Sequence, residues 1–357
     1  MAKGIYKGFY DNSRILNALD KNGKKPIILF VCSRGRSLGK TYSFCKTLWT
    51  RFEETGDKFI LLTRRKKEMG QVAMGVMKGY LENERPDVVL EERKQIAGTF
   101  SNIYANIGTG EDREVMHCGY VIPLAAADDI KKISSLFVDA WCILFDEFQP
   151  SLMSGYLPDE VDALLRIHTS VARGGGQSIR YVPIFMLSNA INIFNPYFIQ
   201  SGLVGKIQSN TRVYVGEGYI YERCMVLGAA EKQRELGLGS IFHTQENNYE
   251  DDNSWMADNN SCVCKPDGWG HSLYICTFLN GNESYACRFY PEVGMFYLDR
   301  HPDKTHKEIY NVRLGGSMNI PFVKTCPAIV SLKEKFMGGM CRFADNGLQQ
   351  FMLELFV

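Results

Sequence analysis

The chain has 357 residues, which is long enough for two domains, the first large enough to bury a sizeable core. Its hydrophobic (45%) and charged (23%) fractions are typical of a soluble globular protein, and no apolar run is long enough to span a membrane. The net charge of +1 gives no sign of a nucleic-acid partner but does not exclude one, because a local basic face is enough to bind DNA. Because the eleven cysteines form no disulfide framework and no secretory signal is recognised, we expect a reducing, cytoplasmic setting.

The first informative pattern is a predicted strand, Ile27–Cys32, followed by a glycine-containing turn and a helical pattern. Strand, Gly-Lys-Thr turn and helix is the context of a phosphate-binding loop, in which backbone N–H groups and the helix N-terminus point at phosphate oxygens. Lys40 would reach the β- and γ-phosphates, and the Thr41 hydroxyl would bind Mg²⁺. The match is imperfect, because Arg34 occupies the first glycine position. The predicted nucleotide-binding residues are Arg34, Gly35, Ser37, Leu38, Gly39, Lys40 and Thr41.

A second predicted strand, Phe59–Thr63, runs directly into the basic sequence Arg64-Arg65-Lys66-Lys67. Such a run is usually a solvated loop, but it leaves the strand at the edge where the phosphate loop lies. It could therefore contact nucleotide, a neighbouring subunit or DNA phosphates. The following elements are predicted as a helix over Met69–Tyr80, strands over Thr99–Ile107, Glu114–Cys118 and Gly119–Ala126, and a helix over Ala127–Ser134.

Two acids, Asp146 and Glu147, end the apolar run that begins at Trp141. An unbroken apolar run is typical of a buried parallel strand, whose carboxyl end would place both acids near the phosphate loop. Asp146 suits the role of holding the hydration shell of Mg²⁺, and Glu147 that of polarising the attacking water. The alternative, two acids that merely solvate a strand end, is less probable after a phosphate loop in the same domain.

The helix Asp159–Arg173 and the buried strand Val182–Leu187 complete this region. Arg173 precedes three glycines, and two interpretations stay equal: a cation that complements the helix dipole, or an arginine finger presented to a neighbouring nucleotide. Asn189 follows the strand, and beside the other two motifs a sensor of hydrolysis is favoured over a turn-capping residue. Arg36, within the phosphate loop, is either a surface arginine or a cation close to phosphate. Strands alternating with helices predict a doubly wound, mainly parallel sheet.

The last third of the chain differs in composition. Residues 222–260 are rich in charge, Asn and Gln, and residues 206–265 are predicted to form a linker with a helix over Glu222–Leu236. Residues 266–357 are predicted to form a smaller α+β domain. Cys262 and Cys264 are interpreted as structural thiols rather than zinc ligands, because no matching Cys or His pair lies nearby. The remaining predictions are strands over His271–Leu279, Tyr285–Tyr290 and Met295–Leu298, a C-terminal helix, and two weak nuclease candidates, Asp299 and Asp303.

These motifs resemble a known family. Asp146-Glu147-Phe148, Glu160–Leu165, Leu187–Ala190 and Asn195–Phe198 are similar to segments of the DNA-encapsidation ATPases of small, protein-primed podophages, which are relatives of the terminase large subunits. The resemblance covers roughly residues 27–200. It implies a P-loop NTPase of the ASCE/terminase type over residues 1–205, with ATP and Mg²⁺ as cofactors.

The resemblance also implies roles for individual residues. Glu147, Arg173, Asn189 and Arg36 match catalytic positions, the last as the arginine of the phosphate loop. Lys67 matches a basic residue implicated in nucleotide handling, and Thr41 and Asp146 match the Mg²⁺ ligands.

The function that the resemblance implies is an ATP hydrolase that drives double-stranded viral DNA into an empty procapsid. It would form a homo-oligomeric ring, a pentamer, on the capsid portal (connector), in the host cytoplasm and away from any membrane. The C-terminal domain would be RNase H-like and vestigial as a nuclease, because the strand His271–Leu279 carries no acid. Two alternatives stay open: a complete terminase large subunit with endonuclease activity, and a non-motor nucleotide-binding assembly protein.

Overall fold

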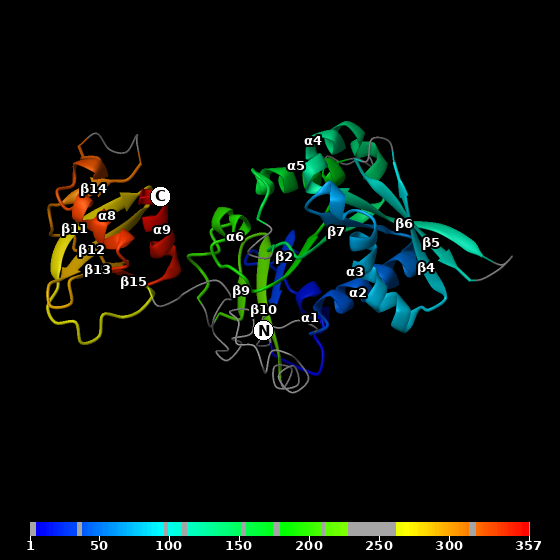
Figure 1. The fold of residues 1–357 in the computed structure, drawn as a ribbon, viewed down its shortest axis with the longest axis horizontal. Coiled ribbons are helices and arrows are strands. Elements are labelled where there is room, and N and C mark those ends of the chain that lie inside the picture. Colours follow the sequence, from blue (N-terminus) through cyan, green and yellow to red (C-terminus); the bar gives the residue numbers. More distant parts are fainter. Residues whose placement is uncertain are drawn as a thin grey trace. The chain divides into compact units, whose positions relative to one another are not determined.

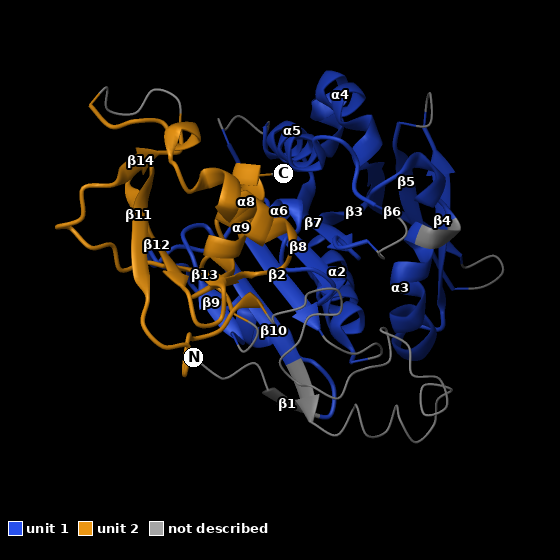
Figure 2. Cartoon of the chain, turned by 60° about the vertical axis from the view of Figure 1, so that its left-hand side comes forward, with its two compact units in different colours: residues 1–197, 211–257 blue, residues 198–210, 258–357 orange. Residues whose placement is uncertain are grey.

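The computed structural model divides the chain into two compact units, residues 1–197 with 211–257 and residues 198–210 with 258–357 (Figure 2). Each unit has its own sheet and its own hydrophobic core. The residues that the structure describes are 5–33, 38–95, 99–108, 113–150, 155–173, 179–208, 211–227, 262–313 and 319–356.

The larger unit is built on a ten-stranded sheet within the described residues. Its order is β1-β10-β2-β8-β7-β3-β6-β5-β4, with β9 paired to β10. All neighbours from β1 to β6 along this path are parallel, whereas β6-β5-β4 and β9-β10 are antiparallel. The strands are β1 Ile5–Lys7, β2 Ile28–Ser33, β3 Lys58–Thr63, β4 Val88–Lys94, β5 Ser101–Ile107, β6 Glu114–Pro123, β7 Ala140–Asp146, β8 Ile184–Asn189, β9 Val213–Val215 and β10 Tyr219–Leu227.

Helices follow the strands of this unit, as the alternating pattern predicts (Figure 1). The α-helices are α1 Ser13–Leu16, α2 Lys40–Thr55, α3 Gln71–Glu84, α4 Ala127–Ile130 and α5 Glu160–Ala172, and the 3₁₀ helices are η1 Lys66–Glu68, η4 Leu124–Ala126 and η5 Lys131–Phe137. Helix α6, Pro196–Gln200, begins in this unit, and its residues from 198 onward belong to the smaller one.

Helix α2 shows how the helices attach to the sheet. Five side chains at helical spacing, from Phe44 to Phe52, are buried in one core with strand residues such as Leu29 and Leu61. Burial of such side chains stabilises the fold by about 1.5–3 kcal/mol each. The helix ends at Gly56, whose φ of 75° lies in the left-handed region and whose N–H bonds the Phe52 carbonyl at 2.8 Å.

The smaller unit contains a five-stranded sheet of order β14-β11-β12-β13-β15. Strands β11, β12 and β13 form an antiparallel meander, β14 is parallel to β11, and β15 is parallel to β13. Side chains of its helices, including Leu332 and Phe351, share a core with Phe278 and Leu298 of the strands. The elements are β11 Leu273–Asn280, β12 Glu283–Tyr290, β13 Met295–Asp299, β14 Ile309–Asn311, η8 Val323–Thr325, α8 Ile329–Met337, β15 Cys341–Phe343 and α9 Asn346–Phe356.

The predicted fold class is confirmed: a mixed α/β unit with a large, mainly parallel sheet, followed by a smaller α+β domain with a second sheet. Cys262 and Cys264 both have free thiols. Within the described residues, no helix is both long and apolar enough to cross a membrane.

The prediction of a linker over residues 206–265 is wrong for its first part. Tyr219–Leu227 is strand β10, which lies between β1 and β2 in the large sheet, so the predicted helix does not include residues 222–227. The charges of Glu222 and Arg223 suggested an exposed segment, but both side chains are buried. The Glu222 carboxylate accepts hydrogen bonds from Tyr10 and Arg14. The remainder of the predicted helix lies outside the described residues.

Other differences concern the edges of the sheet. Strand β4 was not predicted because four of its seven residues are charged, which is common on an edge strand. The two strands predicted over Glu114–Cys118 and Gly119–Ala126 form one continuous strand, β6, as far as Pro123, whereas Leu124–Ala126 form the 3₁₀ helix η4. Together β4, β5 and β6 make the antiparallel extension drawn in cyan in Figure 1.

Hydrogen–deuterium exchange tests the placement of β10. Backbone amides of residues 219–224 should exchange much more slowly than those of the edge strand β4, because β10 has a neighbour on both sides. Exchange of the 219–224 amides as fast as that of an unstructured peptide would support the linker instead.

Candidate functional site

Three neighbouring parallel strands place polar side chains at one edge of the sheet. Strand β8 lies between β2 and β7 (Figure 2), and at their carboxyl ends Asp146 of β7 pairs with Leu187, two residues before Asn189. Ser33 pairs with Asn189 in register, and its hydroxyl donates to Asn189 Oδ1 at 3.4 Å. The predicted convergence of the motifs at the carboxyl ends of the strands is therefore present in the structure.

The start of α2 faces these strand ends. Gly39, the N-cap, has a φ of 84°, a conformation that favours glycine. Lys40 Nζ donates to Ser33 Oγ at 3.3 Å, and Thr41 Oγ1 donates to Asp146 Oδ2 at 2.9 Å. The N-terminus of this 16-residue helix therefore directs its positive end and its first two side chains toward the strand ends. Arg34, Gly35, Arg36 and Ser37 lie outside the described residues.

The two acids after β7 have different environments. Burial raises the pKa of the Asp146 carboxyl above its ordinary value, although the Lys40 charge and the Thr41 hydrogen bond act against this shift. Glu147 is exposed and has a φ of 57°, in the left-handed region that non-glycine residues adopt at a cost of about 1–3 kcal/mol. Strained backbone of this kind is concentrated at functional sites. Glu147, which has this conformation, lines the cleft described next.

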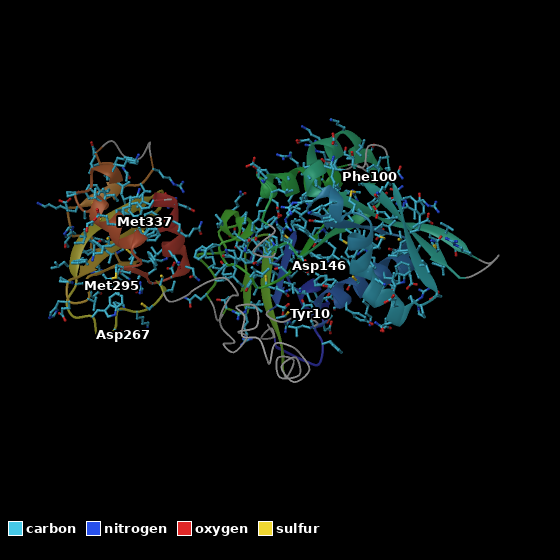
Figure 3. The ribbon with its side chains drawn as sticks, in the orientation of Figure 1. Tyr10, Phe100, Asp146, Asp267, Met295 and Met337 are labelled. Atoms are coloured by element: carbon cyan, nitrogen blue, oxygen red, sulfur yellow. The ribbon has the colours of Figure 1, made fainter. Side chains whose placement is uncertain are left out.

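The cleft has a volume of about 1700 Å³, which is large enough for a nucleotide. Asp146 and Tyr10, both labelled in Figure 3, line this cleft. Lys67 and Arg173 do not line the cleft in the described part of the chain; both are exposed, Lys67 in η1 and Arg173 at the C-cap of α5. The predicted site residues that line the cleft are Leu38, Gly39, Lys40, Thr41, Asp146, Glu147 and Asn189.

A buried ion pair lies directly behind the cleft and was not predicted. Arg64, 6% exposed, donates from Nε to both carboxylate oxygens of Glu160 at 3.1 and 2.9 Å. The same guanidinium donates to the carbonyl oxygens of Glu147 at 3.4 Å and Phe148 at 2.7 Å. Glu160 also accepts the Tyr197 hydroxyl at 2.7 Å. Arg64 thus fixes the backbone that presents Glu147, whereas the sequence placed it only within a basic run, either solvated or in contact with nucleotide, a neighbouring subunit or DNA.

Gln149 makes a second connection that the sequence did not indicate. Its side-chain oxygen accepts the backbone N–H groups of Ile191 at 3.2 Å and Asn192 at 2.8 Å. Its amide also donates to the Cys32 thiol at 3.7 Å. These bonds hold the segment after β7 against the segment after β8 and the end of β2. A buried glutamine has no local signature, because its partners lie more than forty residues away.

The acids of the smaller unit have structural partners. Asp299 accepts Arg288 Nε at 2.7 Å and the His301 N–H at 2.7 Å. Asp303 accepts the Thr305 hydroxyl and N–H, which lowers the pKa of the Asp303 carboxyl. Within the described residues, no group of three His, Cys, Asp or Glu side chains could hold a metal ion.

Comparison with known proteins places this geometry in a family. The model of the podovirus DNA encapsidation protein (Gp16) family matches residues 7–357. The DNA packaging protein of Bacillus phage phi29 is 25% identical over 333 residues, which cover 90% of this chain and 91% of that protein. The DNA packaging protein of Bacillus phage B103 is 25% identical over 329 residues, covering 90% of this chain and 94% of that protein.

A solved structure supports the same fold. A chain of the bacteriophage phi29 viral genome packaging motor assembly matches with a TM-score of 0.64 and 23% identity, covering 98% of this chain and 99% of that one.

Replacement of Glu160 by Gln tests the buried pair. The change leaves the Arg64 charge buried and uncompensated, so it should lower the free energy of unfolding by about 3–5 kcal/mol. The matched control is Glu82→Gln, because Glu82 forms an exposed pair with Lys78 and its loss should cost about 0.3–0.5 kcal/mol. Urea unfolding followed through the buried Trp49 of the same unit measures both. Equal effects of the two variants would contradict the proposed importance of the pair.

Proposed function

The chain belongs to the podovirus DNA encapsidation protein family, and we propose that it is an ATP-hydrolysing motor that moves double-stranded viral DNA into an empty procapsid. The observation that carries the proposal is that Lys40, Thr41, Asp146, Glu147 and Asn189 line one cleft at the ends of β2, β8 and β7. The relatives in phages phi29 and B103 are DNA packaging proteins, which supports the direction of transport.

The phosphates of ATP would bind at the start of α2. The backbone N–H groups of the first helical turn have no partner within the helix and favour an anion, and Lys40 adds a full positive charge beside them. Lys40 and Asn189 both bond the Ser33 hydroxyl. A phosphate that draws Lys40 away from Ser33 would therefore alter the hydrogen bonding of Asn189, which suits the role of a sensor.

The oxygen atoms beside this position suit Mg²⁺. Thr41 Oγ1 and Asp146 Oδ2 are 2.9 Å apart, and hydroxyl and carboxylate oxygens are hard donors of the kind that Mg²⁺ binds together with water and phosphate. When bound, the ion would neutralise charge on the β- and γ-phosphates. Thr41 and Asp146 would hold it, and Glu147, exposed in the same cleft, would accept the proton of the attacking water.

Arg173 suits a role in a neighbouring subunit. Helix α5 is 13 residues long, so Arg173 lies about 20 Å along the helix from Glu160, which is bound behind the cleft through Arg64. Arg173 does not line the cleft of its own chain in the described residues, which supports a homo-oligomeric ring in which each subunit completes the next site. We propose Arg36 and Lys67 as further nucleotide contacts, and a pentamer as the ring size, from the family resemblance.

The proposed setting is the host cytoplasm, at the portal of the procapsid during assembly. Residues 266–357 would contact DNA or the portal rather than cleave DNA. The ion pair of Asp299 with Arg288 supports this assignment, because an acid held in this way is poorly suited to bind a catalytic metal. Cleavage of DNA with Mn²⁺ that is lost in Asp299→Ala would favour the complete terminase instead.

The variant Glu147→Gln tests the proposed base. It should lower ATP turnover by about 10²- to 10⁴-fold and leave ATP binding intact, because the carboxylate acts only in proton transfer. Turnover is measured at rising protein concentration with and without double-stranded DNA, and the wild type should be stimulated by both. Glu54→Gln is the matched control, since Glu54 lines the same cleft farther along α2. Normal turnover of Glu147→Gln would reject the assigned base, and unstimulated wild type would favour a non-motor protein.

Mixing of two inactive variants tests Arg173. Arg173→Ala and Lys40→Ala should each abolish turnover alone, and mixed rings should recover part of it, because an intact cleft can then lie beside an intact arginine. Arg166→Ala, on the exposed side of the same helix, should remain active alone. Mixed rings without any recovered turnover would support the helix-dipole role.

A further inference from the structure

The segment of residues 8–13 lies directly against the phosphate-binding helix. The Tyr10 N–H bonds the Leu38 carbonyl at 2.9 Å, and the Asn12 N–H bonds Ser43 Oγ at 3.1 Å. The Asn12 side chain donates to the Ser43 carbonyl at 3.1 Å and to Thr47 Oγ1 at 2.9 Å. This segment, which we call the N-terminal strap, is therefore fixed to the first turns of α2.

The side chain of Tyr10 anchors the strap from inside. Its ring stacks on Phe44 of α2, with centroids 6.3 Å apart, and its hydroxyl donates to Glu222 of β10 at 3.1 Å. The ring is 3% exposed. Tyr10 thus holds the strap to α2 and to the sheet at once. The backbone next to Phe9 is thereby fixed beside α2.

Phe9 contrasts with Tyr10. Its side chain is 76% exposed and lines the cleft together with Lys40 and Thr41. Its Cβ lies against Gly39, where an added Cβ would be only 3.1 Å away. Most of this large apolar side chain is therefore exposed in the cleft, beside the residue that precedes the helix proposed to bind phosphate.

We propose that Phe9 is the platform on which the base of the bound nucleotide stacks. The inference rests on the proposed function, because it takes the phosphates to bind at the N-terminus of α2. With the phosphates there, the ring of Phe9 beside Gly39 lies at the edge of the phosphate site, where the rest of the nucleotide must extend.

The chemistry of the strap favours stacking over hydrogen bonding. The Asn12 amide is bonded to α2, and Asp11 Oδ1 accepts the Ser13 N–H at 2.9 Å. The aromatic ring is the main apolar surface that the strap offers at the cleft, and stacking a base on it removes apolar area of both partners from water. Base–aromatic stacking of this kind changes affinity by roughly 5- to 150-fold.

Two ligands separate base binding from phosphate binding: ATP and inorganic tripolyphosphate, each with Mg²⁺. Isothermal titration calorimetry on the full chain compares the wild type with Phe9→Ala, Phe9→Trp and Leu19→Ala. We expect Phe9→Ala to weaken ATP binding by roughly 5- to 150-fold and to leave tripolyphosphate binding unchanged. Phe9→Trp should retain ATP affinity. Leu19→Ala should change neither affinity, because Leu19 is also an exposed apolar residue near the N-terminus but does not line the cleft.

Each other outcome has a distinct meaning. Unchanged ATP affinity in Phe9→Ala would overturn the inference and leave Phe9 as a contact for another macromolecule. Equal weakening of both ligands would also overturn it, because the strap would then act only by positioning α2. A wild-type chain that binds neither ligand would overturn the proposed function itself.

Discussion

The buried pair of Arg64 and Glu160 determines the position of much of the site. Arg64 connects the end of β3 to the carbonyl oxygens of Glu147 and Phe148, and Glu160 is the first residue of α5. A buried ion pair is favourable only when further hydrogen bonds satisfy its remaining polar atoms. Here the backbone carbonyls and the Tyr197 hydroxyl do so. One pair therefore orients the proposed base and also the helix that carries Arg173 at its other end.

The order of the strands determines which polar groups meet. Because β8 lies between β2 and β7, a chain of hydrogen bonds runs from Lys40 through Ser33 to Asn189, while Thr41 bonds Asp146. A shift of one residue in the pairing of β2 with β8 would turn every side chain to the other face and break this chain. The parallel register is thus as important to the site as the identity of the residues.

The sequence predicted those parts of the site that have local signatures. Lys40 and Thr41 follow a strand and open a helix, and Asp146 ends an apolar run, so each could be found within a short window. Arg64 and Gln149 could not, because their partners are distant in the chain and nothing local indicates burial. The same limit explains the two main errors in the fold. Charged residues in β4 lie on an exposed edge, whereas Glu222 in β10 is buried with partners from the N-terminal segment, and both strands resemble loops in the sequence.

Strand β10 helps to hold the N-terminal strap in place. Glu222 of β10 binds Tyr10 and Arg14, so the strap is held at α2 by a strand that the sequence suggested was part of a linker. A buried carboxylate costs free energy unless it is paired, and this cost makes the strap and the strand depend on each other.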